Sequence, residues 1–229
     1  MKAHACLALV AAAVALTAAG VASAAIEPVT SVWAGRNNHP PYILQSITVR
    51  DYTVTREFLA TGTSVGAALL GTSIKNADDF DLNSLATRNG SGVWKVTEIE
   101  KKPLWRDRNG ENPDFFIFEV GMNDVLSVQA ILPGGELGAV VDFRDAKWGN
   151  VGLKRVGLLN MGQPIGGIAF AITDLLDAGG QPLSSKAAIQ GIQINSGEVD
   201  PAGFYAVVPE PATLLILGLG WLILRRHRS

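Results

Sequence analysis

The alternation of apolar and polar residues divides the chain into three parts. An apolar run occupies residues 1–24, and a shorter one spans 212–224. Between them, short apolar stretches with polar residues interleaved end at Gly or Pro every eight to fifteen residues. A period of two residues is typical of strands, and no long stretch there follows the 3.6-residue period of a helix. The middle part is therefore predicted to be mainly β.

Several stretches of the middle part have the composition of strands, being rich in β-branched and aromatic residues. The segment 114–120 contains a continuous aromatic run, which is typical of a strand buried on both faces. Within 42–54, we expect Ile47, Val49 and Val54 to point inward, and we expect the Lys and Glu side chains of 93–100 to face water. The predicted strands are 42–54, 93–100, 114–120, 125–132, 137–143, 165–172, 188–194 and 203–207.

This spacing of Gly and Pro favours short antiparallel strands. We predict a mainly β fold with a single antiparallel β-sandwich over residues 25–207. Helix is expected to be minor within it, limited to turns near 77–85 and 173–176. The two apolar runs are predicted to flank the sandwich as an N-terminal signal helix and a C-terminal membrane helix.

The first apolar run has the organisation of a secretory signal peptide. Lys2 supplies the positive charge, an Ala-rich stretch follows, and the small residues of 22–24 fit positions −3 and −1 of a cleavage site. We predict that residues 1–24 are a signal peptide and that a signal peptidase cleaves after Ala24 or Ala25. An uncleaved membrane anchor is the alternative. Because the only cysteine, Cys6, lies in this run, the mature domain has no thiol for a disulfide or a metal.

Residues 208–229 contain three parts in order: Val-Pro-Glu-Pro-Ala-Thr, a Leu- and Gly-rich segment, and an Arg cluster. The two prolines prevent a helix there and keep the backbone extended. As a helix, 212–224 would be about 20 Å long against a bilayer core of about 30 Å, although long Arg side chains extend its reach. We predict a membrane helix over 212–224, with Arg225, Arg226 and Arg228 as a positive-inside stop.

These three parts together resemble the PEP-CTERM sorting signal. In that bacterial family, a membrane cysteine transpeptidase-like enzyme, the exosortase, recognises the Pro-Glu-Pro motif and removes the tail. The resemblance implies that Pro209, Glu210 and Pro211 are the recognition residues and that 214–224 is a disposable anchor. It also implies export alongside exopolysaccharide and biofilm-matrix systems. An ordinary tail anchor with an incidental Pro-Glu-Pro is the alternative.

The middle domain has a resemblance of its own. The segments Asn112–Glu119, Gly121–Asp124 and Ile189–Ile194 are similar to those of uncharacterised exported PEP-CTERM proteins. The β-sandwich of those proteins is like a galactose-binding or carbohydrate-binding jelly roll, so the resemblance implies a jelly-roll-like sandwich here. It supplies no catalytic signature, because fold alone does not determine function.

The net charge of the middle domain argues against a nucleic-acid partner. Residues 25–208 contain 15 Lys and Arg against 20 Asp and Glu, a net charge of −5, without basic runs. Such a domain lacks the positive surface that a phosphate backbone requires, so no nucleic-acid partner is expected.

Catalytic constellations are scarce in the middle domain. His39 is its only histidine, and neither a Gly-x-Ser-x-Gly elbow nor a zinc ligand set accompanies it. Carboxylates on predicted strands and strand ends leave a glycosidase open, since two such groups can cleave a glycosidic bond. They are Glu98, Glu100, Glu119, Asp142 and Asp145. A solvated face or a turn explains each of them more simply.

No cofactor is predicted, and a structural calcium is the one case left open. Asp79, Asp81 and Asn83 have the Asp-x-Asp-x-Asn spacing of an oxygen-ligand loop, but Ser84 and Gly90 stand where an EF-hand requires Gly and Glu. The acidic stretch 107–112 is a second candidate, which Asn-Gly turn chemistry also explains.

Tryptophans are the remaining candidates, because sugars stack their apolar faces on exposed aromatic rings. The middle domain contains four of them: Trp33, Trp94, Trp105 and Trp148. Trp94 alternates with polar residues and is expected in the core. Trp105 and Trp148 lie in loop-like sequence and are the predicted glycan contacts. Buried packing is the alternative for both.

Taken together, the sequence predicts a non-enzymatic exported surface or extracellular-matrix protein. We expect it to be anchored in the inner membrane by its tail before exosortase processing, then to reach the cell surface or matrix. The expected partner there is exopolysaccharide or biofilm. The alternatives are an extracellular carbohydrate-active enzyme with paired carboxylates, or a purely structural matrix protein.

Overall fold

The computed structural model describes residues 25–35, 41–60, 63–66, 80–82, 90–97, 112–156, 162–199 and 201–207. These residues are mainly in strands, with short 3₁₀ turns at η1 (Arg56–Phe58) and η3 (Ile172–Asp174). The mainly β prediction is therefore confirmed. The strands are β1 (Glu27–Pro28), β2 (Ser31–Ala34), β3 (Leu44–Val49), β4 (Tyr52–Thr55), β5 (Leu59–Ala60), β6 (Thr63–Gly66), β7 (Gly90–Thr97), β8 (Phe115–Val120), β9 (Leu126–Ile131), β10 (Val141–Asp142), β11 (Gly149–Lys154), β12 (Pro164–Phe170), β13 (Gly191–Val199) and β14 (Pro201–Val207).

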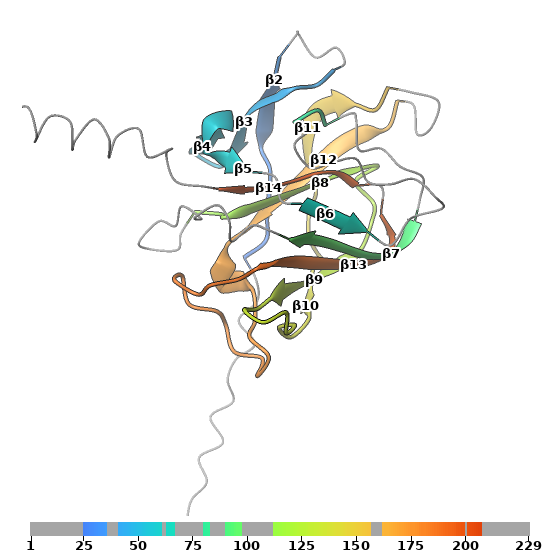
Figure 1. The fold of residues 1–229 in the computed structure, drawn as a ribbon. Helices are drawn as coiled ribbons and strands as arrows, with labels where there is room; N and C mark the ends of the chain where they lie inside the picture. Colours follow the sequence, from blue (N-terminus) through green and yellow to red (C-terminus); the bar gives the residue numbers. More distant parts are fainter. Residues whose placement is uncertain are drawn as a thin grey trace, which may run out of the picture.

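The described strands form three sheets, which lie in layers (Figure 1). The six-stranded sheet has the order β1-β12-β8-β14-β5, with β11 also paired to β12. The five-stranded sheet has the order β10-β9-β13-β7-β6, and the three-stranded sheet has the order β2-β3-β4. Every pairing that these strands make is antiparallel, as the sequence predicted.

Alternate side chains of the six-stranded sheet enter two separate apolar clusters. On β8, Phe115 and Ile117 join a cluster with β9 and β13 of the five-stranded sheet. Phe116 and Phe118 join a second cluster with β3 and β4 of the three-stranded sheet. All six residues of β8 are buried, which confirms that this strand is covered on both faces.

This arrangement has one layer more than the single sandwich that we predicted. A two-sheet sandwich leaves the outer face of each sheet in water, whereas here the six-stranded sheet is covered on both faces. The predicted signal helix and membrane helix, residues 1–24 and 212–224, lie outside the described residues. Within the described ranges, no helix is long and apolar enough to cross a membrane.

Several predicted strands differ from the observed ones at their ends. The stretch 42–54 is a hairpin of β3 and β4, because Arg50, with a φ of 52°, turns the chain between them. Ile47, Val49 and Val54 are buried as predicted. Within the predicted strand 137–143, only β10, Val141–Asp142, is a strand. The predicted strand 188–194 corresponds to β13, which continues to Val199. The strands β1, β2, β5, β6 and β11 are not among the predicted strands, since each is short or interrupted by a polar residue or glycine.

Candidate functional site: the outer face of the three-stranded sheet

The three-stranded sheet turns one face inward and leaves the other to solvent. Side chains alternate along each strand. The inward side chains are apolar, and they pack on the six-stranded sheet: Val32, Ala34, Leu44, Ile47, Val49 and Val54. The alternation is interrupted at Gln45, where the register of β2 and β3 shifts and the side chain donates to the Ile43 carbonyl. The other outward positions hold one tryptophan and five hydroxyl residues: Ser31, Trp33, Ser46, Thr48, Thr53 and Thr55. We call these six residues the Trp33 face.

Strand register arranges the Trp33 face in two rows. Ser31, Thr48 and Thr53 are Cα partners across β2, β3 and β4, and so are Trp33, Ser46 and Thr55. The Oγ1 atoms of Thr48 and Thr53 lie 3.0 Å apart. Because neighbouring strands are about 4.8 Å apart, the hydroxyl groups are regularly spaced across the face.

Trp33 is the most exposed of the large hydrophobic side chains in the described residues, with 67% of its surface accessible. It lies on β2, which is an edge strand of its sheet. Its sequence neighbours Val32 and Ala34 point the other way, into the core. An indole held this way on a rigid sheet is available for stacking contacts.

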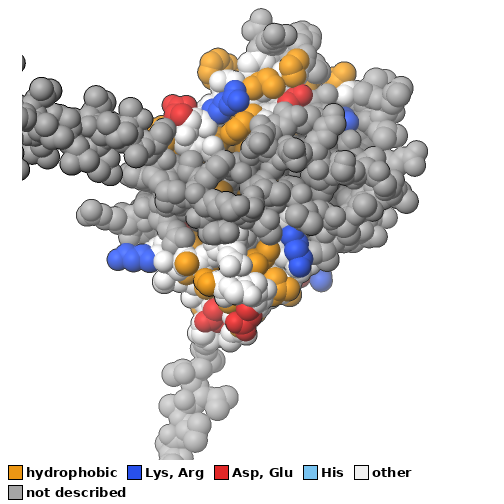
Figure 2. Space-filling view, viewed as in Figure 1, with side chains coloured by type: hydrophobic (Ala, Val, Ile, Leu, Met, Phe, Trp, Pro, Cys, Tyr) orange, Lys and Arg blue, Asp and Glu red, His pale blue; other side chains and the backbone are white. Residues whose placement is uncertain are grey.

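Charged groups are placed at the margin of the Trp33 face, and none of its six residues is charged. A hydrogen bond from the Thr55 side chain, together with one from the Glu57 backbone, lowers the pKa of Glu57, so this carboxylate is ionised at neutral pH. Arg50, in the β3–β4 turn, is paired with Glu27 at 2.5 Å. Elsewhere, in the view of Figure 2, the described Lys, Arg, Asp and Glu side chains are scattered and do not form a patch of one sign.

Tyr42 and Asp81 connect the start of β3 to residues 80–82, which follow the three-stranded sheet along the chain. The Tyr42 backbone N–H donates to Oδ1 of Asp81 at 2.7 Å. Burial raises the pKa of Tyr42, and the negative charge of Asp81 adds to this, whereas a hydrogen bond with the Lys154 backbone opposes it. Asp81 is thus engaged as a backbone acceptor.

Only some of the predicted calcium ligands are among the described residues. Asp79, Asn83 and 107–111 lie outside the described residues, and Asp81 holds the Tyr42 amide. Among the residues that the structure does describe, no group of three or more His, Cys, Asp or Glu side chains could hold a metal ion.

Of the two predicted glycan contacts, Trp105 lies outside the described residues. Trp148 is half-buried and packs against the cluster between the six-stranded and five-stranded sheets. Its indole N–H donates to the Asp124 carbonyl at 3.1 Å. Trp148 and Trp33 therefore belong to different parts of the fold, and the role of Trp148 in glycan contact stays a prediction.

The carboxylates that left a glycosidase open have separate environments. Glu119 is fully buried, and its Oε2 accepts the Met122 N–H at 2.6 Å. Asp142 is exposed and forms an ion pair with Arg144 at 3.2 Å. Asp145 is also exposed. Glu98, Glu100 and His39 lie outside the described residues. Of the described candidates, Glu119 is thus engaged with the backbone in the interior, and Asp142 is paired with Arg144 at the surface.

Sequence reasoning missed the Trp33 face as a unit. The signal was present as Ser31 and Trp33 at alternate positions of 31–34, and as Ser or Thr at alternate positions of 46–49 and 52–55. Assembling it required the register of three strands, which no single stretch of sequence contains.

The sorting motif lies beyond this domain along the chain, and Pro209, Glu210, Pro211, Arg225, Arg226 and Arg228 are outside the described residues. No curated protein and no solved structure matched the chain. Comparison with known protein families matched residues 207–229 to the PEP-CTERM protein-sorting motif. The chain therefore carries a PEP-CTERM sorting motif, which implies that it is an exported protein sorted through the exosortase pathway.

Proposed function

We propose that this exported protein is non-enzymatic and that its domain binds a neutral polysaccharide strand outside the cell through the Trp33 face. The observation that carries the proposal is the exposed Trp33 ring set in an array of hydroxyl groups on a rigid sheet. The domain then acts as a carbohydrate-binding module of the surface or extracellular matrix, in keeping with the jelly-roll-like resemblance of its sequence.

The chemistry of the face suits a sugar polymer. The indole of Trp33 offers a flat apolar surface for the C–H face of a pyranose ring. Serine and threonine hydroxyls both donate and accept hydrogen bonds, as sugar hydroxyls do. A hydrogen bond between two hydroxyl groups, such as Thr48 and Thr53, can be exchanged for one to the ligand.

Charge favours a neutral ligand over an acidic one. The six residues of the face are uncharged, and Glu57 at its margin is ionised. The domain as a whole has a net charge of −5. An acidic polysaccharide would therefore be repelled, while a neutral one would not.

The sorting motif supplies the location that this function needs. After export and removal of the tail by exosortase, the domain would be released from its anchor in 212–224 to the cell surface or matrix. A polysaccharide there would present the same sugar unit many times along its chain, so the Trp33 face would meet many equivalent sites on one polymer.

Retention of the exported chain on immobilised polysaccharide tests the proposal. The probes are exopolysaccharide from the producing bacterium, an insoluble neutral glucan and an acidic polyuronate. Trp33→Ala is expected to weaken retention on a neutral polymer by about tenfold or more, the equivalent of about 1.4 kcal/mol of stacking. Val140→Ala, at another exposed apolar residue, is the matched control and should bind as the parent does.

Each other outcome has a defined meaning. Equal retention of the Trp33→Ala and Val140→Ala variants would refute the Trp33 face as the binding site. Loss of retention by Trp148→Ala in place of Trp33→Ala would move the site to Trp148. Release of reducing ends from the polymer would show a glycosidase, and absence of binding to every polymer would indicate a purely structural matrix protein.

A further inference from the structure

Residues 25–30 connect two of the three sheets, and we call them the N-terminal strap. In β1, Glu27 and Pro28 pair with Ala169 and Ile168 of the six-stranded sheet. The next residue, Val29, donates its N–H to the Gly167 carbonyl at 3.0 Å. Thr30 then donates its N–H to the Thr48 carbonyl of the three-stranded sheet at 2.8 Å. The strap therefore starts on one sheet and ends on the other.

The strap is packed as well as hydrogen-bonded. Val29 is fully buried in the cluster between these two sheets, and Ile26 packs against the other cluster. Two glycines make room for it. A Cβ on Gly149 would collide with the Val29 carbonyl, and one on Gly167 would lie 2.9 Å from Cγ2 of Val29. The fold is thus built around a strap in this position.

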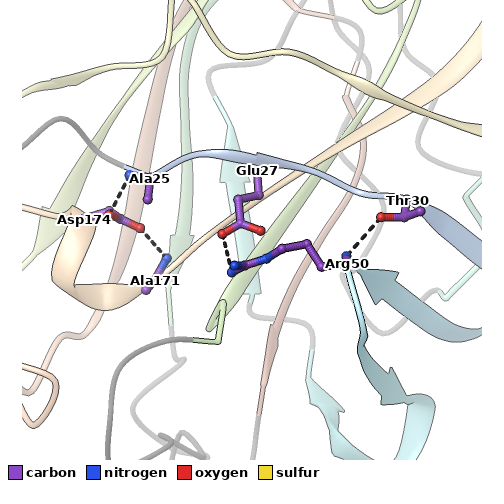
Figure 3. A network of polar contacts seen from close by, with 6 residues as sticks. All are labelled: Ala25, Glu27, Thr30, Arg50, Ala171 and Asp174. Atoms are coloured by element: carbon purple, nitrogen blue, oxygen red, sulfur yellow. Dashed lines mark hydrogen bonds and ion pairs between the residues drawn. The ribbon is translucent and has the colours of Figure 1, made fainter.

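Polar contacts hold the strap along its length, as Figure 3 shows. Oε1 of Glu27 pairs with Nη2 of Arg50 at 2.5 Å. The backbone N–H of Arg50 donates to Oγ1 of Thr30 at 3.0 Å. At the other end of the strap, the nitrogen of Ala25 donates to Oδ1 of Asp174 at 2.9 Å.

A second hydrogen bond orients the Asp174 carboxylate for its contact with Ala25. Its Oδ2 accepts the Ala171 N–H at 2.7 Å, so both carboxylate oxygens are oriented (Figure 3). It belongs to η3, whose first residue, Ile172, is buried and donates its N–H to Oδ2 of the buried Asp114 at 2.8 Å. The Ala25 nitrogen therefore meets a carboxylate that is already in place.

We propose that Asp174 is the binding site for the free α-ammonium group of a mature chain that begins at Ala25. Hydrolysis of the Ala24–Ala25 peptide bond by a signal peptidase adds the hydroxyl group of water to the Ala24 carbonyl carbon and its proton to the Ala25 nitrogen. That amine takes up a further proton at neutral pH and becomes an ammonium. The hydrogen bond to Asp174 then joins opposite charges, which makes it stronger than the same bond from an amide.

This proposal decides between the two cleavage positions that the sequence leaves open. Cleavage after Ala24 places the new charge on the atom that contacts Asp174. Cleavage after Ala25 removes that atom and leaves Ile26 as the first residue. The Ala25 side of the contact is exposed to solvent, so the additional protons of an ammonium have space.

The first test is the mass of the exported, processed chain and of its N-terminal peptide. An N-terminal peptide that begins at Ala25 is the expected result. A chain that begins at Ile26, or that retains residues 1–24, would overturn the proposal. This result does not depend on polysaccharide binding.

The second test separates the charge from the hydrogen bond. A chain that keeps two added residues, Gly-Ser, before Ala25 retains the N–H that donates to Asp174 but has its ammonium elsewhere. The extension is expected to lower the Tm by about 2 °C, the size of a partly exposed ion pair in a chain of this length. In an Asp174→Asn background, the same extension should have no effect on the Tm.

A control and a second readout keep the result interpretable. In an Asp177→Asn background, where Oδ1 of Asp177 accepts the Gln181 N–H, the extension should lower the Tm as it does in the parent. Acylation of the α-amino group, followed by mass spectrometry, should be slower in the parent than in Asp174→Asn. An equal effect of the extension in all three backgrounds, together with equal acylation rates, would contradict the proposal.

Discussion

Two phenylalanines on β8 test the three-layer arrangement, because they point to opposite faces of one strand. Phe115 packs in the cluster with the five-stranded sheet, and Phe118 packs in the cluster with the three-stranded sheet. Neither has accessible surface. Phe115 has the rings of Phe170 and Phe204 at 5.3 and 6.2 Å, and Phe118 has the ring of Tyr205 at 5.8 Å.

Replacing either phenylalanine by alanine should therefore lower the free energy of unfolding by a similar amount. A fully buried Phe→Ala change costs about 3–5 kcal/mol, which combines lost apolar burial with the cavity that remains. That is a large share of a total stability of about 5–15 kcal/mol. With a urea m-value near 2 kcal/mol/M, each midpoint should fall by about 2 M.

Urea unfolding of the exported chain, followed by tryptophan fluorescence, measures both variants. Lys95→Ala is the control, because this side chain on β7 is exposed and its removal should change stability by less than about 0.5 kcal/mol. A loss below about 1 kcal/mol for Phe118→Ala, with the full loss for Phe115→Ala, would refute the reasoning, since it would mean that the three-stranded sheet does not cover this face.

Two further predictions concern alkaline stability and sorting. Because burial raises the pKa of Tyr42, its contribution to stability is present below the ordinary phenol pKa of about 10 and is lost as the pH rises through the folded-state value. Tyr42→Phe should thus make the free energy of unfolding fall less steeply above pH 10, and identical slopes in urea titrations would contradict this. Replacing Pro209, Glu210 and Pro211 by alanine should leave the uncleaved chain in the membrane fraction, as detected with a C-terminal tag. Normal release of the mutant chain would show that the tail is not processed at this motif.

The sequence predicted those features that are encoded in one continuous stretch. The aromatic run of β8 indicated burial on both faces, and the alternation at Ile47 and Val49 indicated that these side chains point inward. Residues 207–229 contain a complete sorting motif, so it could be identified without the fold.

Features that depend on pairing between distant segments could not be predicted. The third sheet exists because β2 pairs with β3 and packs across the six-stranded sheet, and a short strand such as Ser31–Ala34 does not specify that partner. The turn at Arg50 adopts a left-handed conformation that is unusual for arginine, so the residue type there does not predict a hairpin. The Trp33 face has the same origin, since its six residues come together only through register.

The central claim, that Trp33 contacts polysaccharide, is tested most directly by the exposure of this one ring in solution. The measurement is acrylamide quenching of tryptophan fluorescence in the exported chain, with and without soluble neutral exopolysaccharide, compared with Trp33→Phe. Since 67% of the Trp33 surface is accessible, the polymer should reduce quenching in the parent and leave it unchanged in the variant. Trp33→Phe should also keep more affinity than Trp33→Ala, because a phenyl ring still stacks on a sugar. Unchanged quenching in the parent at saturating polymer would contradict the account.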